Sequence, residues 1–409
     1  MRQRRWMRVA APLAALALFA AACGGDDTDP AADDTADETG DDTDAADDAG
    51  DDAEGGEDGE GGEDGDDAEA AGGECETFDQ TSLQLKWVAQ AQFAGFFAAD
   101  DLGFYADECL EVDILEGGPD VGPAQVVAGG GADFGIDWVA ATLGQRAAGE
   151  DFITVAQIYQ RSGLMQVAWA DSGIESFEDL EGTTVGAWGF GNEYELLAGL
   201  QQAGLDPESD VELVDQPFDM SLLLNREIDS AQAITYNEYA QLLETVDPET
   251  GELYQPEDFT VLDMNEAGVA MLHDGIFASE AFVSENPDIT ERFLRASFRG
   301  WMHCRDNLED CVQFTFDRGS ILGQGHQRWM MNEVNALIWP SPNGIGFMDP
   351  EAFEQTAELA TTYVDVIEEQ PGDEAYTNEY AEAAWEGLEG DPFGEDFERD
   401  DVEVTEGGE

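Results

Sequence analysis

The amino-acid sequence predicts an α/β protein with two lobes, each built on a mainly parallel sheet flanked by helices. Two observations predict this fold class. Between residues 85 and 137, strand-like runs and helical patterns alternate in the order βαβαβ, and the alternation restarts near residue 176. Such an alternation is typical of parallel strands joined by crossover helices. Two lobes of this kind, joined by two chain crossings, form a hinged architecture with a crevice between them.

The first lobe opens with an apolar run at Leu83, Leu85 and Trp87. Ligands of parallel sheets lie outside the carboxyl ends of the strands. Residues 90–93, 117–120 and 137–138 should therefore line one crevice. The periodicity after this run predicts helices over 96–105, 123–128 and 142–148, and strands at 112–115, 132–136 and 153–158.

The second lobe follows an apolar run at residues 164–170. It starts with a short helix capped by Ser176 and Asp179. Apolar runs at 259–264 and 269–272 are expected to return the chain to the first lobe. The pattern predicts strands at 184–188, 211–214 and 230–234, and helices at 193–203, 220–226, 279–281, 288–304 and 350–367. We assign residues 75–165 and 266–386 to the first lobe, 166–265 to the second and 387–409 to an acidic tail.

The N-terminal residues have the pattern of an export signal. Four arginines within residues 2–8 precede an apolar stretch at 9–22 that is too short to span a bilayer. The stretch ends in small residues before Cys23 and resembles a bacterial lipobox, in which the cysteine carries lipid. We expect a signal peptide at residues 1–22, with a plain secretory signal as the alternative to a lipid anchor. The protein would then be exported, by the general or the twin-arginine route, and anchored to the outer face of the cytoplasmic membrane.

The composition is strongly acidic. The 409 residues include 94 acidic and 15 basic ones, for a formal net charge of -79. This charge repels nucleic acid and anionic membranes, so we expect membrane contact only through the lipid anchor. Residues 23–74 have the low-complexity acidic composition of a disordered tether. The acidic excess indicates either halophilic adaptation or solubility alone.

Four cysteines remain beyond the anchor: Cys75, Cys109, Cys304 and Cys311. An oxidising environment outside the cell allows two disulfides. Cys75 with Cys109 would fix the first residues of the lobe, and Cys304 with Cys311 needs a bend between them. The alternative is four unpaired buried thiols. No histidine or second cysteine stands at a zinc spacing, so neither a metal nor a cofactor is expected.

Residues 86–99 read KWVAQAQFAGFFAA. Together with residues 103–105, they resemble the opening of the ABC-transporter substrate-binding proteins for thiamine pyrimidine precursors and related solutes. Residues 117–120, 132–136 and 236–238 resemble later segments of that family. The resemblance implies a type II periplasmic binding fold (Venus flytrap), a small-molecule ligand, and delivery to an ABC permease and its ATPase. Relatives bind pyrimidines, riboflavin, nitrate or sulfonates such as taurine, and we expect a monomer.

Aromatic residues gather at the predicted strand ends and turns: Trp87, Phe93, Trp138, Trp188 and Phe190. Flat aromatic walls suit a flat heterocycle, because stacking of a base on an aromatic ring contributes ~1–3 kcal/mol. The alternative for each ring is ordinary core packing.

Polar residues at the same places suggest the ligand's charge. Asn192 and Glu195 stand at capping-box spacing, which leaves Glu193 to bind an exocyclic amine or to face solvent. Asp137 and Glu193 together disfavour an anion. Strand alternation should point Lys86, the only lysine, away from the side of Trp87. A neutral or amine-bearing ligand is therefore expected.

The expected ligand is an aminopyrimidine precursor of thiamine, held from both lobes. Gln92, Phe93 and Asp137 would hold it from the first lobe, and Trp188, Glu193 and Tyr236 would clamp it from the second. Further donors and acceptors, each with a turn role as the alternative, are Gln90, Gln92, Asn237 and Glu238.

Two other functions stay open. Intracellular relatives make the thiamine pyrimidine with an active-site histidine and a cysteine-rich motif. This chain lacks that motif, and His273, His303 and His326 lie outside the expected crevice segments, so we expect no enzyme. The third function is a surface sensor or adhesion module that uses the same clamp without a permease.

Overall fold

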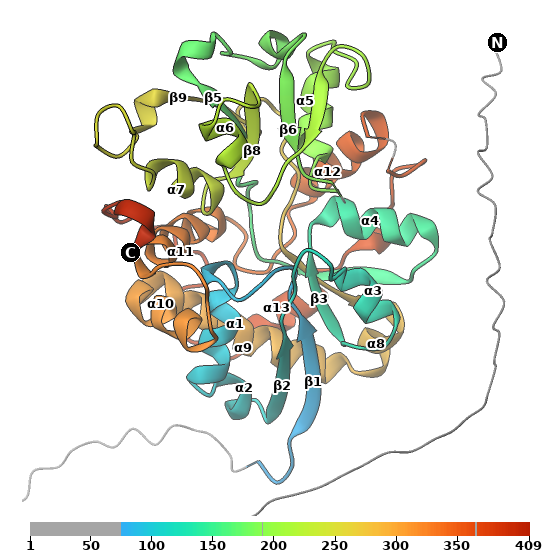
Figure 1. The fold of residues 1–409 in the computed structure, drawn as a ribbon. Helices are drawn as coiled ribbons and strands as arrows, with labels where there is room; N and C mark the ends of the chain where they lie inside the picture. The colour runs from blue at the N-terminus through green and yellow to red at the C-terminus, as the bar shows by residue number, and fades with distance from the viewer. Residues whose placement is uncertain (1–74, 190, 365) are drawn as a thin grey trace, which may run out of the picture. The chain divides into compact units, whose positions relative to one another are not determined.

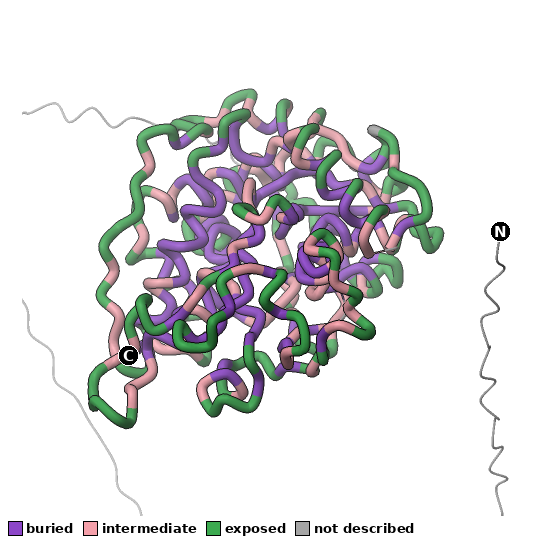
Figure 2. Tube along the Cα trace, turned by 90° about the horizontal axis from the view of Figure 1, so that it is seen from above, coloured by how far each residue is buried: buried purple, intermediate pink, exposed green. Residues whose placement is uncertain are grey.

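The computed structural model describes residues 75–409 except Phe190 and Asp365. The predicted signal peptide, the anchor residue Cys23 and the acidic segment before residue 75 lie outside the described residues, as does Phe190. Among the residues that are described, no helix is both long and apolar enough to cross a membrane. Buried residues fill the interior, and exposed residues occupy the outer loops (Figure 2).

Lobe 1 is built on a five-stranded sheet in the order β2-β1-β3-β10-β4. The first three strands run parallel, and β10 is antiparallel to both of its neighbours. The sheet is therefore mainly parallel, as predicted. Its strands are β1 (Asp79–Gln84), β2 (Leu110–Leu115), β3 (Phe134–Asp137), β4 (Phe152–Gln157) and β10 (Gly275–Ser279).

Lobe 2 repeats this plan in the upper half of Figure 1, in the order β7-β6-β8-β5-β9. Here β7, β6 and β8 are parallel, and β5 is the antiparallel strand between β8 and β9. Its strands are β5 (Leu164–Trp169), β6 (Thr184–Ala187), β7 (Glu212–Asp215), β8 (Ser230–Ile234) and β9 (Phe259–Asp263). The chain crosses between the lobes twice, at residues 158–163 and 264–274.

Helices cover both sheets. Those of the first lobe are α1 (Ala94–Asp101), α2 (Phe104–Asp107), α3 (Pro123–Ala128), α4 (Val139–Ala148), α8 (Glu280–Glu285), α9 (Pro287–Asp306), α10 (Leu308–Asp317), α11 (Gln324–Ile338) and α13 (Glu379–Trp385). Those of the second lobe are α5 (Tyr194–Gln202), α6 (Ser221–Leu224) and α7 (Glu238–Leu243). Helix α12 (Pro350–Thr362) packs against α4 and α5.

The predicted return to the first lobe is wrong in its position. Strand β9 pairs with β5 in the second sheet, and residues 269–272 form no strand. The returning strand is β10, which begins at Gly275. Val269, Met271 and Leu272 are apolar because they are buried where the second crossing packs against neighbouring helices and strands, not because they belong to a sheet. Helices α7, α10, α11 and α13 were not predicted.

A close helix contact fixes the chain that leads into the crevice. A Cβ added at Gly300 of α9 would lie 1.9 Å from the carbonyl oxygen of Gly95 in α1, so only glycine allows this approach. The indole ring of Trp301 is fully buried beside Gly95. The short helix η1 (Ala91–Phe93) runs directly into α1 and packs against α10 and α11, where the Ala91 amide donates to Gln327 Oε1. The corner at residues 90–93 therefore rests on a rigid base.

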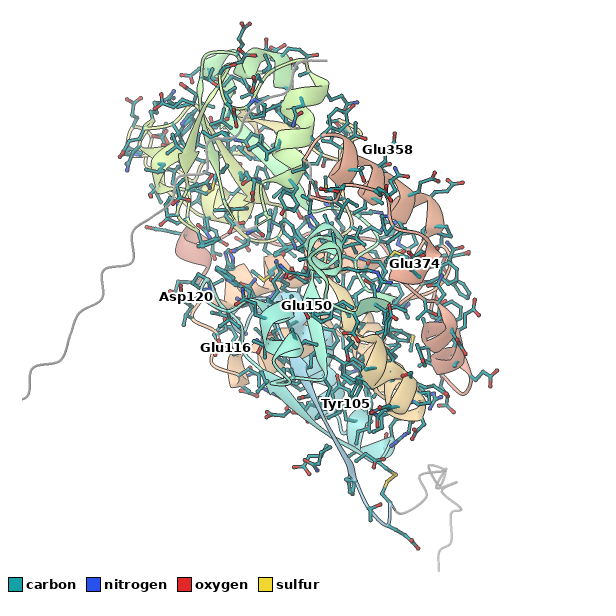
Figure 3. All side chains as sticks on the ribbon, turned by 90° about the vertical axis from the view of Figure 1, so that its right-hand side faces the viewer. Tyr105, Glu116, Asp120, Glu150, Glu358 and Glu374 are labelled. Atoms are coloured by element: carbon teal, nitrogen blue, oxygen red, sulfur yellow. A yellow bond between two sulfur atoms is a disulfide. The ribbon has the colours of Figure 1, made fainter. Side chains whose placement is uncertain are left out.

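The structure contains the two disulfides Cys75–Cys109 and Cys304–Cys311. Asn307 ends α9 and precedes α10, which provides the bend between the second pair of cysteines. The acidic tail packs on both lobes. Asn332 and Asp400 exchange hydrogen bonds, and the Gly407 amide donates to the carbonyl of Glu244. Elsewhere, acidic side chains such as Glu150, Glu358 and Glu374 project into solvent (Figure 3).

Candidate ligand-binding cleft

A cleft of about 580 Å³ lies between the lobes, a volume within the usual range for small-molecule sites. Lobe 1 contributes loops after β1, β2 and β3 together with the start of α4. Lobe 2 contributes loops after β6, β7 and β8. The lining residues are Lys86, Trp87, Gln90, Gln92, Asp137, Trp138, Ala141, Gln145, Trp188, Tyr194, Phe218, Ile234, Tyr236, Asn237, Glu238 and residues 118–125 and 191–193.

Of the described residues proposed from the sequence as ligand contacts, the cleft brings together all but Phe93. The Phe93 side chain is 0% exposed and packs in the core of lobe 1. Helix η1 turns it inward, while the neighbouring Gln92 faces the cleft. The expectation that Phe93 contacts the ligand is therefore wrong, because the corner alternates its side chains between core and cleft.

Lys86 also differs from expectation. Strand β1 ends at Gln84, so the alternation of a strand does not extend to Lys86 and Trp87, and both side chains line the cleft. The Lys86 ammonium lies 2.6 Å from Asp137 Oδ1 and 5.1 Å from the centre of the Trp138 ring. The one lysine of the chain is thus paired with a carboxylate inside the cleft.

Aromatic rings from both lobes meet at the mouth of the cleft. Trp87 of lobe 1 contacts Phe218 of lobe 2 with ring centres 4.5 Å apart, and Phe218 in turn stacks on Trp188 at 5.8 Å. Phe218 and Tyr194 were missed in the sequence. Phe218 follows the carboxyl end of β7 as Trp188 follows that of β6, so the rule of strand ends could have found it.

Glu193 lines the cleft as predicted, but the helix start differs from the predicted capping box. Glu193 itself is the N-cap of α5, and no side chain caps this helix. Its carboxylate accepts from the Gly191 amide at 2.8 Å, and burial raises its pKa. Asn192 Nδ2 donates to the carbonyl of Gly189. Glu195 points instead into the interior between the lobes.

Glu195 belongs to a buried polar cluster behind the cleft. Its carboxylate lies 2.7 Å from His273 Nε2 and 2.8 Å from the Ser162 hydroxyl, and all three residues are at most 3% exposed. The imidazole of His273 stacks on the indole of Trp138 with ring centres 3.8 Å apart. Glu195 comes from lobe 2, whereas Ser162 and His273 lie on the two crossings. The cluster therefore ties the second lobe to an aromatic wall of the first.

Asp274 and Tyr236 complete the floor. Asp274 is 2% exposed and accepts from Gln92 Nε2 at 2.7 Å and from Trp138 Nε1 at 3.1 Å. Burial raises the pKa of Asp274, against the effect of the Gln92 hydrogen bond. Burial also raises the pKa of Tyr236 well above its ordinary value. The protonated Tyr236 hydroxyl finds no hydrogen-bond partner among the described residues, which leaves it available to a ligand.

Asn237 and Glu238 start α7 at the cleft wall. Glu238 accepts from the Ile234 amide and from Asn237 Nδ2, and burial raises its pKa to about 7. The Asn237 Oδ1 atom lies 3.0 Å from Nε2 of His326 on α11, whose other ring nitrogen contacts Glu244. This wall is therefore held by an internal network that links α7 to α11.

Comparison with known proteins agrees with this geometry. A family model described as NMT1/THI5 like matches residues 90–310. The chain belongs to the NMT1/THI5-like family. This membership confirms the resemblance inferred from the sequence, and the match includes the cleft residues from Gln90 to Glu238.

Proteins similar to this chain are named for binding riboflavin, for binding formylaminopyrimidine, or as synthases. The chain is 27% identical to the riboflavin-binding protein RibY of Chloroflexus aurantiacus, over 74% of this chain and 86% of that protein. It is 25% identical to the formylaminopyrimidine-binding protein of Halalkalibacterium halodurans, over 58% and 70%. A 4-amino-5-hydroxymethyl-2-methylpyrimidine phosphate synthase of Legionella pneumophila is 31% identical over 32% of this chain and 41% of its own length.

The solved structures support the fold. The periplasmic aliphatic sulphonate binding protein SsuA of Escherichia coli superposes with a TM-score of 0.56 at 14% identity, over 71% of this chain and 89% of that protein. At this identity the likeness concerns the fold alone. This NMT1/THI5-like protein thus has the two-lobed fold of periplasmic binding proteins, as the sequence predicted.

We predict that Glu195→Ala lowers the free energy of unfolding by about 3–5 kcal/mol, because it leaves the buried His273 and Ser162 groups without their acceptor. Urea denaturation measures the change. The control is Glu309→Ala, which removes an exposed ion pair with Arg328 and should cost less than ~1 kcal/mol. Equal losses in the two variants would contradict the role of the buried cluster.

We predict that Glu238 makes stability depend on pH. Its pKa is raised from 4.5 to about 7, so the native state keeps a proton that the unfolded state releases. This stabilisation is complete below pH 4.5 and is lost as the pH rises to 7, a change of roughly 3 kcal/mol. Unfolding free energies of the wild type and Glu238→Gln from pH 4 to 8 check this. The wild type should lose stability relative to the variant, and parallel profiles would contradict the assignment.

Proposed function

We propose that this protein is the solute-binding component of an ABC importer that captures a flat nitrogen heterocycle between its two lobes. The ligand stabilises the closed arrangement by touching both lobes, and the closed form docks on a permease. The observation that carries this proposal is the cleft itself, whose aromatic walls come from both lobes. Trp87 and Trp138 belong to lobe 1, and Trp188 and Phe218 to lobe 2.

The charges of the cleft support an uncharged or amine-bearing ligand. Lys86 is paired with Asp137, so its charge is already balanced. Glu193 adds a carboxylate to the wall formed by lobe 2, and Glu238 adds a carboxyl group whose pKa of about 7 leaves it partly ionised at neutral pH. A sulfonate or nitrate would have to displace Asp137 from Lys86 and would then face these carboxylates. An exocyclic amine or a ring N–H would find acceptors in the same place.

Two ligand types fit this description. An aminopyrimidine related to the thiamine precursors is the first, since a relative is named for formylaminopyrimidine. Riboflavin is the second, because the relative named for it covers more of this chain and the cleft of about 580 Å³ has room for a three-ring system. Both present a flat ring with N–H groups at its edge.

The proposal includes export and anchoring. Residues 1–22 would be removed as a signal peptide, Cys23 would carry the lipid, and residues 23–74 would tether a monomeric binding unit to the outer face of the membrane. The two disulfides support an oxidising compartment. The predicted boundary at residues 165/166 falls inside β5, so the first lobe would comprise residues 75–157 with 275–386 and the second lobe residues 164–263.

We propose capture of a solute rather than synthesis, although some relatives are named synthases. The three histidines support this choice. His273 is stacked behind Trp138, His326 is held by Asn237 and Glu244, and His303 lies at the end of α9 beside Asp310. Among the residues that the structure describes, none of the three histidines lines the cleft.

A thermal-shift titration tests the proposal. We expect an aminopyrimidine or riboflavin to raise the melting temperature in a concentration-dependent manner, since a ligand that binds only the native state stabilises it. Taurine and nitrate should leave the melting temperature unchanged. Stabilisation by the two anions alone would overturn the proposed ligand class.

A variant tests the aromatic mouth. Trp87 is partly exposed, so Trp87→Ala should fold and should bind the heterocycle roughly 5- to 100-fold more weakly, because one stacking surface is lost. Isothermal titration calorimetry measures the affinity. Phe393→Ala is the control, since Phe393 is an exposed aromatic residue outside the cleft. An unchanged affinity for Trp87→Ala would exclude Trp87 from the site.

A further inference from the structure

Two glutamine amides form a row in the floor of the cleft. Gln90 and Gln92 both line the cleft and are at most 4% exposed. Gln92 Nε2 donates to Asp274 Oδ2 at 2.7 Å, and Gln90 Nε2 donates to Gln92 Oε1 at 2.6 Å. An amide group has one donating end and one accepting end. Each hydrogen bond in the row therefore fixes the orientation of the next amide.

Asp274 is the fixed end of this row. It does not line the cleft, and it stands at the end of the second crossing, where its backbone φ of 41° lies in the left-handed region. Asp is one of the few residues besides glycine that tolerates this region. Its Oδ1 atom accepts from Trp138 Nε1, an atom that can only donate. Its Oδ2 atom then meets the donating end of Gln92.

The free end of the row faces the cleft. Gln90 uses its Nε2 atom for Gln92, and its Oε1 atom accepts no hydrogen bond from any described residue. The row thus ends in an acceptor at the cleft floor. We infer that Asp274 is a positioning residue that sets the hydrogen-bond polarity of this floor and selects solutes with an N–H donor at the ring edge. This inference rests on the proposed function.

A single substitution at Asp274 should reverse the direction of every hydrogen bond in the row. In Asp274→Asn, Oδ1 must still accept from Trp138, so Nδ2 is turned toward Gln92 as a donor. Gln92 must then turn to accept, its amino group faces Gln90, and Gln90 must accept in turn. The amino group of Gln90 would then face the cleft. The same fold would present a donor where the wild type presents an acceptor.

The experiment measures affinities by calorimetry for two matched pairs of solutes. One pair is 4-amino-5-hydroxymethyl-2-methylpyrimidine and its 4-dimethylamino analogue, and the other is riboflavin and its N3-methyl derivative. The wild type should bind the N–H member of at least one pair ten or more times more tightly. In Asp274→Asn this preference should fall at least tenfold. Asp133→Asn, which alters a carboxylate that binds Thr81 and Ser82 away from the cleft, should keep the wild-type preference.

Two further variants test whether Asp274 sets the hydrogen-bond polarity of the cleft floor or only stabilises the fold. Gln90→Leu removes the terminal acceptor without touching Asp274 and should lose the preference as well. Gln90→Glu in the Asp274→Asn background restores an acceptor at the cleft floor and should restore the preference, which a folding defect would not allow. A folded Asp274→Asn or Gln90→Leu with an unchanged preference would overturn the inference. A wild type that binds none of the four solutes would overturn the proposed function and the inference with it.

Discussion

The stack of Trp138 on His273 connects the first lobe, the second crossing and, through Glu195, the second lobe. Trp138 follows the last residue of β3, His273 lies on the second crossing, and Glu195 of lobe 2 holds His273 from behind. A flat ring in the cleft would therefore rest on a platform whose position is set by both lobes and by the hinge. Because the cluster is buried, its hydrogen bonds are costly to break and the platform stays fixed. Under the proposed function, the position of this platform would depend on His273 and Glu195, which do not line the cleft.

Electrostatics inside the cleft differ from those of the surface. The chain has a net charge of -79, yet its single lysine lies in the cleft and is paired with Asp137. Removing both charges from water has a cost that their close contact reduces. Because the two charges balance, the Lys86–Asp137 pair adds no net charge to the cleft. A protein with a strongly acidic composition can thus hold a lysine in its cleft without adding net charge there.

Much of the fold was predictable because local patterns and the topology agree. The βαβ order, the helix at 123–128 and the strands around residues 112–115, 184–188 and 230–234 appear where periodicity placed them. The return strand was misplaced, since an apolar run at 269–272 is equally compatible with a strand and with a buried crossing. Periodicity reports burial, and it cannot tell which neighbour provides that burial. Helices α7, α10, α11 and α13 also lay outside the predicted elements.

In the candidate site, too, local pattern predicted some residues and could not predict others. The rule that ligands lie beyond the carboxyl ends of parallel strands placed Gln90, Gln92, Asp137 and Trp138 in one cleft. It could not place Phe93, because successive residues of the corner at residues 90–93 alternate between cleft and core, and Phe93 falls on the core side. Nor could it find Asp274, which is far from Gln92 in the chain and reaches it only through the antiparallel return of β10.

By itself, the sequence determined the two lobes, the strand ends that meet between them, the four cysteines able to pair and the acidic surface, since each follows from local pattern or composition. Only the tertiary structure decided that Lys86 is neutralised by Asp137, that Glu195 holds His273 instead of capping a helix, and that Asp274 orients the amides of the cleft floor. The physical reason is that these are hydrogen bonds and ion pairs between residues distant in the chain. Their partners are chosen by the packing of the lobes and leave no periodic signal in the sequence.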